Sequence, residues 1–296
     1  MSRADKYFRD QMKVIRETGF NDKDFKVRAK WEADNAPAHT IKTFGYVTRY
    51  DLSKEFPILT LRSQGFKGAV KECLWIFQKK STNINDLGLH IWDAWADPET
   101  LEVGPVYGYQ WRNWGGQGID QLQEIVDKIK NNPFDRRMIL SAWNVSDIPQ
   151  MHLPPCHMFA QFYVRIVGEK KYLDCQVYQR SADLFLGVPF DIASYATLMH
   201  IIGYLSDSIP DKLVYVFGDT HVYVNHIDVV KEQIQRTPYE LPVLKIDGLT
   251  GDLFSGADNN GVYHAKINKT LNDFTFDDFK VEGYKYYPAL KAEVAV

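Results

Sequence analysis

Residues 179–206, QRSADLFLGVPFDIASYATLMHIIGYLS, join a strand to a long helix and set the architecture of the chain. The preceding residues, 172–179, alternate like a strand, so the strand ends in the polar group Arg180, Ser181 and Asp183. A turn with glycine and proline follows, and residues 190–206 are apolar almost throughout, which predicts a long, mostly buried helix. Polar groups at a strand end beside a helix start suit recognition of an anion or a base.

Hydrophobic patterning outside this stretch predicts the remaining elements. Apolar residues at helical spacing favour helices over 4–18, 66–79, 119–130 and 222–236. Alternation and β-branched or aromatic residues favour strands over 40–50, 137–143, 158–167 and 213–217. The last residues, 280–296, are strand-like and apolar at the end, which suits either an edge strand or a flap over a site. We expect a single α+β domain, 1–296, with a mostly antiparallel or mixed sheet.

Composition excludes several classes of protein. With 45% hydrophobic and 25% charged residues, disorder and coiled coil are poor interpretations, and a net charge of -3 argues against a nucleic acid partner. No run of 18 apolar residues exists, so no membrane-spanning helix is expected. The charged start MSRADKYFRDQMK lacks a secretory h-region, and three cysteines are too few for a disulfide framework. A reducing cytoplasm is the simplest location.

Leu153-Pro154-Pro155-Cys156-His157 is the first candidate for chemistry. The two prolines hold the chain extended before Cys156, which favours presentation of a nucleophilic sulfur. An inert core cysteine is the alternative, and it is favoured for Cys73 and Cys175, which lie in helix and strand patterns. The sequence has no Cys-x-x-Cys and no histidine pair with zinc-motif spacing, so no metal is expected.

Two more segments carry polar groups. Arg136 and Arg137 follow a turn, where guanidinium forks suit phosphate oxygens, although an exposed turn with solvated charges explains them equally well. His221 and Tyr223 lie two apart at the end of an apolar strand, so in an extended segment they face one side. They suit a sugar hydroxyl; a capped helix start with a buried histidine is the alternative.

Together these segments resemble the thymidylate synthase family from about residue 5 to 296. The matching segments are HIWDAWAD (90–97), GPVYGYQW (104–111), DRRMILSAWN (135–144), LPPCH (153–157), QRSADLFLGVPFDIASY (179–195), GDTHVYVNH (218–226) and the AEVAV tail. The resemblance implies a three-layer α+β fold with a large mixed sheet and a homodimer whose sheets stack back to back. It also implies a pyrimidine nucleoside monophosphate as substrate and 5,10-methylenetetrahydrofolate as cofactor.

The resemblance also implies catalytic roles. Cys156 is similar to the thiolate that adds to C6 of the pyrimidine, which makes C5 nucleophilic. Arg180 would bind the phosphate and lower the pKa of this thiol through its charge. Glu72 would organise waters for proton transfer, Tyr107 would assist proton removal at C5, and Asp183 would hydrogen-bond the pterin.

The remaining implied roles are in binding. The nucleotide would be held by polar side chains: Arg136, Arg137, Gln179, Ser181, Asp191, His157, His221 and Tyr223. Of these, the Arg136–Arg137 pair would reach the phosphate in the other subunit, and the His221–Tyr223 pair would hold the ribose 3′-hydroxyl. The folate would be contacted by Trp92, Leu153, Asp183, Gly187, Arg62 and Ala295. Arg62 stands where the family usually has a lysine near the glutamate tail, and Ala295 and Val296 would close over the complex.

Two positions depart from the family pattern. Many members place a phosphate-binding arginine near residues 35–40, where this chain has none; His39 is one replacement, and reliance on the remaining arginines is the other. The second departure is Asp191, where thymidylate synthases carry asparagine.

Asp191 changes which base the site matches. An asparagine amide donates to O4 of uracil and accepts from N3–H, whereas cytosine presents an N4 donor and an N3 acceptor. An ionised aspartate only accepts, so uracil O4 would face a like group. We therefore expect dCMP as substrate and hydroxymethylation, or otherwise methylation, at C5. The alternatives are a protonated or water-bridged Asp191 that still serves dUMP in a thymidylate synthase, and a non-catalytic binding relative.

Overall fold

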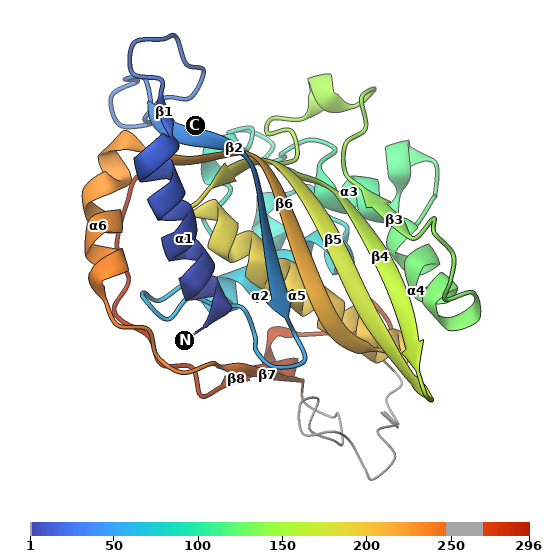
Figure 1. Cartoon of the computed structure of the whole chain (residues 1–296). Coiled ribbons are helices and arrows are strands. Elements are labelled where there is room, and N and C mark those ends of the chain that lie inside the picture. Colours follow the sequence, from blue (N-terminus) through green and yellow to red (C-terminus); the bar gives the residue numbers. More distant parts are fainter. Residues whose placement is uncertain (1, 247–268) are drawn as a thin grey trace.

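A six-stranded mixed sheet forms the centre of the computed structural model, which describes residues 2–246 and 269–296 (Figure 1). Its order is β1-β2-β6-β5-β4-β3, and every neighbouring pair is antiparallel except β5 and β6. The strands are β1 (Phe20–Asn21), β2 (Thr40–Asp51), β3 (Ile139–Ser141), β4 (His157–Val167), β5 (Lys170–Asp183) and β6 (Ile209–Tyr223). The predicted α+β class with a mixed sheet is confirmed.

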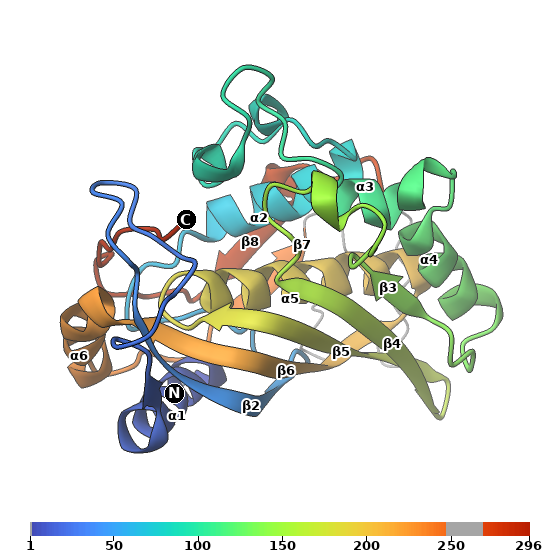
Figure 2. The same ribbon diagram turned by 90° about the horizontal axis from the view of Figure 1, so that it is seen from above.

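Helix α5 (Gly187–Ser206) connects the parallel strands β5 and β6 across one face of this sheet. It is buried over most of its length because its surface is apolar all round, with Asp191 as its only acidic residue. Helix α2 (Phe66–Leu74) packs on α5 on the side away from the sheet, which makes three layers (Figure 2). Because β5 and β6 are parallel, their carboxyl ends meet at one edge, where Asp183 pairs with His221.

The other elements surround this frame. Helix α1 (Arg3–Thr18) packs against β2, and α6 (Ile227–Gln235) follows β6. Helices α3 (Tyr107–Arg112) and α4 (Gln121–Asn131) lie on the α5 side (Figure 2). A small antiparallel sheet of β7 (Val243–Ile246) and β8 (Phe279–Glu282) lies on the same side, apart from α3 and α4 (Figure 1). In the described residues, no helix covers the other face over β4 to β6 (Figure 1). That open face is the one expected to pack in a homodimer, which stays a prediction.

Several boundaries differ from the sequence-based expectation. The helix predicted from 222 begins at Ile227, because β6 continues to Tyr223 between its two neighbours β2 and β5. The helix predicted over 66–79 changes at Trp75 into a π-helical turn, Trp75–Lys79. The edge-strand interpretation of 280–296 is confirmed for residues 280–282, which belong to β8. After Glu282 the tail adds no strand to either sheet and has an isolated bridge at Ala295, so the interpretation is wrong for the rest. In the described part of the chain, no helix is both long enough and apolar enough to span a membrane.

Candidate active site

Cys156 lies at the start of β4, held from three sides. Its backbone N–H donates to Tyr107 Oη at 2.8 Å, and its carbonyl accepts from the backbone N–H of Arg180 on β5 at 2.8 Å. The Arg180 guanidinium donates to the carbonyls of Pro155 at 2.9 Å and Pro154 at 2.7 Å. The prolines lack N–H groups but keep their carbonyls, so the LPPC segment fixes both the cysteine and the arginine.

Burial favours the protonated form of the Cys156 thiol at neutral pH. Burial raises its pKa to about 11, and the charges of Asp191 and Asp183 also raise it, whereas Arg180 and Arg28 lower it. Arg180 thus acts in the direction expected from its charge, but burial outweighs it. Cys73 and Cys175 are both buried in the core, as expected for inert cysteines, and all three thiols are free.

Glu72 on α2 is a carboxyl poised for proton transfer. Trp92 Nε1 donates to Glu72 Oε1 at 2.6 Å, and burial raises the pKa of Glu72 to about 7. A group with a pKa near the working pH both gives and takes protons readily. The Trp92 ring lies 6.2 Å, edge to face, from the ring of Tyr107, so the carboxyl is linked to the Cys156 side of the site.

Asp191, one turn into α5, is linked to β5 and β4. Gln179 Nε2 donates to Asp191 Oδ2 at 2.8 Å, and His157 Nε2 lies 3.9 Å from Asp191 Oδ1. The His157 ring stacks on Tyr107 with centroids 4.1 Å apart and an interplanar angle of 14°. A nucleotide base that hydrogen-bonds Asp191 would therefore lie beside the residues that hold Cys156.

Burial shifts the pKa values of both Asp191 and His157 toward the neutral forms of these side chains. Burial raises the pKa of Asp191 well above its ordinary value, and the charge of Glu72 raises it further, against the lowering effect of the Gln179 hydrogen bond. Burial lowers the pKa of His157 to about 3. These shifts disfavour an ion pair across the 3.9 Å contact, and Tyr195 Oη, 3.1 Å from His157 Nδ1, orients the His157 ring.

His221 and Tyr223 form a second group of site residues, at the end of β6. Their rings lie 5.3 Å apart, edge to face, and His221 Nδ1 is 2.8 Å from Asp219 Oδ1. In the parallel register of β5 and β6, Ser181 pairs with Asp219, so the phosphate and sugar candidates lie on adjacent strand ends. The segment is strand up to Tyr223, and the capped-helix alternative for this pair is wrong.

The expected folate side carries aromatic rings and two carboxyls. Trp92 packs against Trp75 and Trp95, with centroids 5.7 and 6.0 Å away. Leu153 is partly buried and packs against the same hydrophobic core. A Cβ on Gly187 would touch both Asp183 Cβ and Asp191 Oδ2 at 3.9 Å, so glycine keeps the space between the two carboxyls open. These residues fit a bound pteridine.

Asp183 and Arg62 already have protein partners. Asp183 Oδ1 accepts from the backbone N–H of Phe185 at 2.9 Å and of Leu186 at 3.3 Å. Arg62 is buried, donates to the Phe185 carbonyl and lies 4.7 Å from the centre of the Phe185 ring. Its predicted contact with a glutamate tail would require the guanidinium to leave this position.

Arg136 and Arg137 are exposed in the turn before β3. Arg137 bonds Asp135 through its backbone N–H and Nε, and the Arg136 carbonyl accepts from Gln161. Neither forms a hydrogen bond with the residues around Cys156, so both are available to another molecule. Their role toward the phosphate of a second subunit stays a prediction.

Two residues near the site, Arg28 and Trp31, were not predicted from the sequence. Arg28 lowers the pKa of both Cys156 and Tyr223, which places its positive charge toward the nucleotide site. Trp31 packs edge to face on Tyr223, with centroids 5.3 Å apart, and 5.7 Å from the ring of His226. One feature of the sequence could have indicated Arg28. It is the only arginine between residues 22 and 39, and this segment lacks the phosphate-binding arginine that many family members have near residues 35–40.

The C-terminal tail closes on this same segment. Ala295 bridges to Trp31, and His226 Nε2 donates to the Glu293 carbonyl at 2.9 Å. The tail therefore lies beside Trp31 and His226, whose rings contact Tyr223, as a flap over the site would.

The chain matches the thymidylate synthase family over residues 6–296. It is 41% identical over 288 residues to a thymidylate synthase of Herpesvirus ateles, covering 89% of this chain and 91% of that protein. It is 42% identical over 288 residues to the bifunctional dihydrofolate reductase-thymidylate synthase of Zea mays, covering 89% of this chain and 51% of that protein. The structure of the thermostable thymidylate synthase A from Bacillus subtilis superposes with a TM-score of 0.83 at 37% identity, over 99% of each chain. With Cys156, Arg180 and Tyr107 joined on such a fold, the chain belongs to the thymidylate synthase family.

Proposed function

We propose that this enzyme transfers a one-carbon unit to C5 of deoxycytidine monophosphate, with 5-hydroxymethyl-dCMP as the product. The family supplies the reaction class, one-carbon transfer to a pyrimidine nucleotide with 5,10-methylenetetrahydrofolate. The choice of base is the finer step, and the observation that carries it is Asp191 beside Gln179.

Burial favours the protonated form of the Asp191 carboxyl, which offers one donor and one acceptor. Because Gln179 Nε2 donates to Oδ2, the acid proton is favoured on Oδ1. Cytosine presents the complement, an N4–H donor and an N3 acceptor, and an ionised Asp191 would still accept from N4–H. The ionised form has no donor for uracil O4 and none for cytosine N3, so the full match to cytosine, with N4–H donating and N3 accepting, belongs to the protonated carboxyl.

Four side chains would carry the chemistry. Cys156 Sγ adds to C6 once its proton is lost, and Arg180, whose charge lowers the thiol pKa, favours the thiolate. Glu72, with a pKa of about 7, moves protons between the base and water, and Tyr107 assists the transfer of the C5 proton to water. When bound, 5,10-methylenetetrahydrofolate supplies the one-carbon unit.

The second candidate is a thymidylate synthase that acts on dUMP. Two observations favour it: the relatives about 40% identical carry that name, and a neutral carboxyl has the same one-donor, one-acceptor pair that an asparagine amide presents. A non-catalytic relative is disfavoured because Cys156, Glu72, Tyr107 and Arg180 are all present.

Turnover of dCMP and dUMP by the purified protein tests the base. Sites built on hydrogen bonds commonly discriminate by about 10⁴ or more, so we expect a large excess of kcat/KM for dCMP. The matched variant Asp191→Asn should shift the preference toward dUMP. A strong preference of the unmodified protein for dUMP would establish the second candidate.

The product needs a separate measurement. Mass spectrometry of the nucleotide distinguishes hydroxymethyl from methyl, and formation of dihydrofolate, read by absorbance, accompanies only the methyl product. Dihydrofolate produced in step with dCMP consumption would replace hydroxymethylation by methylation and leave the base assignment intact.

A further inference from the structure

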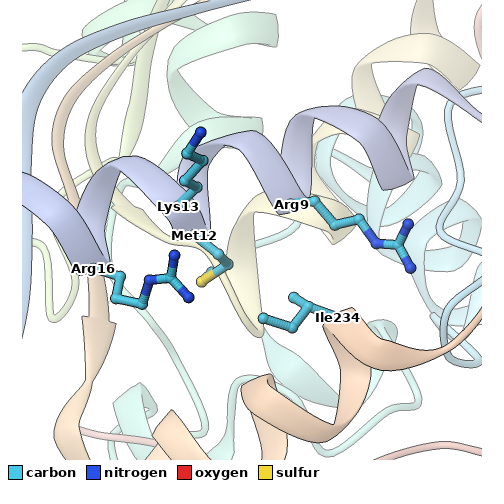
Figure 3. A pocket seen from close by; sticks show the side chains of 5 residues that line it. All are labelled: Arg9, Met12, Lys13, Arg16 and Ile234. Atoms are coloured by element: carbon cyan, nitrogen blue, oxygen red, sulfur yellow. The ribbon is translucent and has the colours of Figure 1, made fainter.

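The cations of α1 around the depression between α1 and α6 do not act on a common target. Figure 3 shows that the head groups of Arg9, Lys13 and Arg16 point apart, so they form no shared anion site. Charged side chains converge instead beside His221, at the end of β6, where the sugar of the nucleotide is expected.

Three charged side chains of alternating sign form a network that ends at His221. Lys42 Nζ lies 2.9 Å from Asp22 Oδ2 and 3.8 Å from Asp219 Oδ2. The other Asp219 oxygen, Oδ1, lies 2.8 Å from His221 Nδ1. Lys42 on β2 is the direct cross-strand partner of His221 on β6, and Asp219 lies two residues before His221. The register of β2 and β6 therefore places all three side chains on the same face of the sheet.

Asp22 is the fixed end of the Asp22–Lys42–Asp219 network. Its buried carboxylate accepts from the backbone N–H of Thr40 at 2.8 Å and from Thr40 Oγ1 at 2.7 Å. Burial raises the pKa of Asp22, but the hydrogen bonds from Lys42 and Thr40 outweigh burial and hold this pKa well below its ordinary value. Burial likewise lowers the pKa of Lys42, but Asp22 and Asp219 outweigh it and raise this pKa. Both shifts favour the charged forms, so Asp22 holds the Lys42 ammonium beside Asp219.

Asp219 is the less constrained member of the network. Its side chain is 41% exposed, whereas that of Lys42 is 31% exposed and that of Asp22 only 5%. Water therefore competes for the Asp219 carboxylate, and the Lys42 charge on the Oδ2 side favours the orientation that leaves Oδ1 at His221. An ion pair as exposed as this one contributes little free energy, so we expect the effect of Lys42 to be smaller than that of Asp219 itself.

The carboxylate at Nδ1 decides which nitrogen of a neutral His221 carries the proton. A carboxylate oxygen only accepts, so the proton is on Nδ1 and Nε2 is left as an acceptor. We propose that Asp219, Lys42 and Asp22 are positioning residues that hold His221 in this tautomer, so that Nε2 accepts a hydrogen bond from the 3′-hydroxyl of the nucleotide. The inference rests on the proposed function for a deoxynucleoside monophosphate as ligand, but not for its base.

Calorimetric titration with nucleotides that have or lack the 3′-hydroxyl tests the network. The probes are dCMP and dUMP, each compared with its 2′,3′-dideoxy counterpart. An asparagine amide can donate to Nδ1 as well as accept from it, so Asp219→Asn no longer fixes the tautomer. We expect Asp219→Asn to weaken binding of the 3′-hydroxyl nucleotide about tenfold and Lys42→Gln about 2–5-fold. Both variants should bind the dideoxy nucleotide as the unmodified protein does.

Matched controls come from an exposed ion pair on α1. Lys6 and Asp10 lie 2.6 Å apart, and Lys6→Gln and Asp10→Asn should leave the affinity for every probe unchanged. Equal weakening of 3′-hydroxyl and dideoxy nucleotides in Asp219→Asn would mean that the network only supports the local fold, and would overturn the proposal. Unchanged affinity of Asp219→Asn for the 3′-hydroxyl nucleotide would overturn it too.

Nuclear magnetic resonance of ¹⁵N-labelled histidine reads the tautomer directly. We expect the Nδ1–H form of His221 in the unmodified protein, with its signals assigned by their absence in His221→Asn, and loss of this preference in Asp219→Asn. The Nε2–H form in the unmodified protein would overturn the proposal, and this measurement decides even where a variant does not fold. The base is tested separately, because a preference for dUMP over dCMP would change the proposed function and leave the comparison of 3′-hydroxyl with dideoxy nucleotides intact.

Discussion

Lys30 and Val296 face each other as an antiparallel backbone pair: the N–H of each donates to the carbonyl of the other at 2.8 Å. The last residue of the chain is thereby fixed to the segment that carries Arg28 and Trp31. Both bonds are made by main-chain atoms, so the identity of the Lys30 side chain does not matter to them, whereas the presence of residue 296 does.

Deletion of Val296 should therefore impair catalysis, and Lys30→Ala should not. Each backbone hydrogen bond contributes about 1 kcal/mol net, so the loss of two corresponds to roughly a 30-fold fall in kcat/KM if the docked tail is the active form. Steady-state kinetics of the two variants measure this. Equal activity of the deletion and the full chain would show that tail docking is not part of the reaction.

Trp31 should support nucleotide binding through Tyr223. Trp31→Ala removes the ring that lies 5.3 Å from Tyr223, whereas Trp31→Phe keeps an aromatic edge there. An aromatic pair contributes about 0.5–1.5 kcal/mol, so we expect KM for the nucleotide to rise about 2–10-fold in Trp31→Ala and less in Trp31→Phe. An unchanged KM with a lowered kcat would assign Trp31 to tail docking alone.

Much of the fold and the site could be predicted from the chain because their signals are local. The apolar run 190–206 specified α5, and the LPPC and QRSAD segments located Cys156, Arg180 and Asp183 at strand ends. The extent of β6 could not be predicted, since its length depends on pairing with β2 and β5 rather than on its own pattern.

The missed features depend on contacts between distant residues. Lys30 and Val296 are 266 positions apart, and their backbone bonds leave no trace in side-chain patterns. Trp31 lies outside any helix or strand, so the hydrophobic periodicity of the sequence says nothing about it. Only its position beside the Tyr223 ring indicates a role. The hydrogen bonds from the Arg180 guanidinium to the Pro154 and Pro155 carbonyls were also missed, because they join residues about 25 positions apart on different segments.

Arg28 should favour ionisation of Cys156. Arg28→Gln removes a charge that lowers the thiol pKa, so alkylation of Cys156 by iodoacetamide at pH 9 should be slower than in the unmodified protein. Peptide mapping separates Cys156 from buried Cys73 and Cys175. Lys26→Gln, an exposed neighbour in the same loop that has no influence on Cys156, is the control, and equal slowing in both variants would contradict the assignment.

Glu72 should make stability and activity depend on pH. Its folded pKa of about 7 lies above the ordinary 4.5, so the folded state holds a proton that the unfolded chain has released between these values. The free energy of unfolding therefore falls as pH rises from about 4.5 to 7 and stays lower above that. Glu72→Gln cannot ionise, so its melting temperature relative to the unmodified protein should rise between pH 4.5 and pH 8. The same substitution should lower kcat and remove an inflection near pH 7 from the kcat profile. A difference in melting temperature that is constant with pH would mean that the pKa of Glu72 is not raised in the folded protein, and the proton-transfer role built on the raised pKa would fail with it.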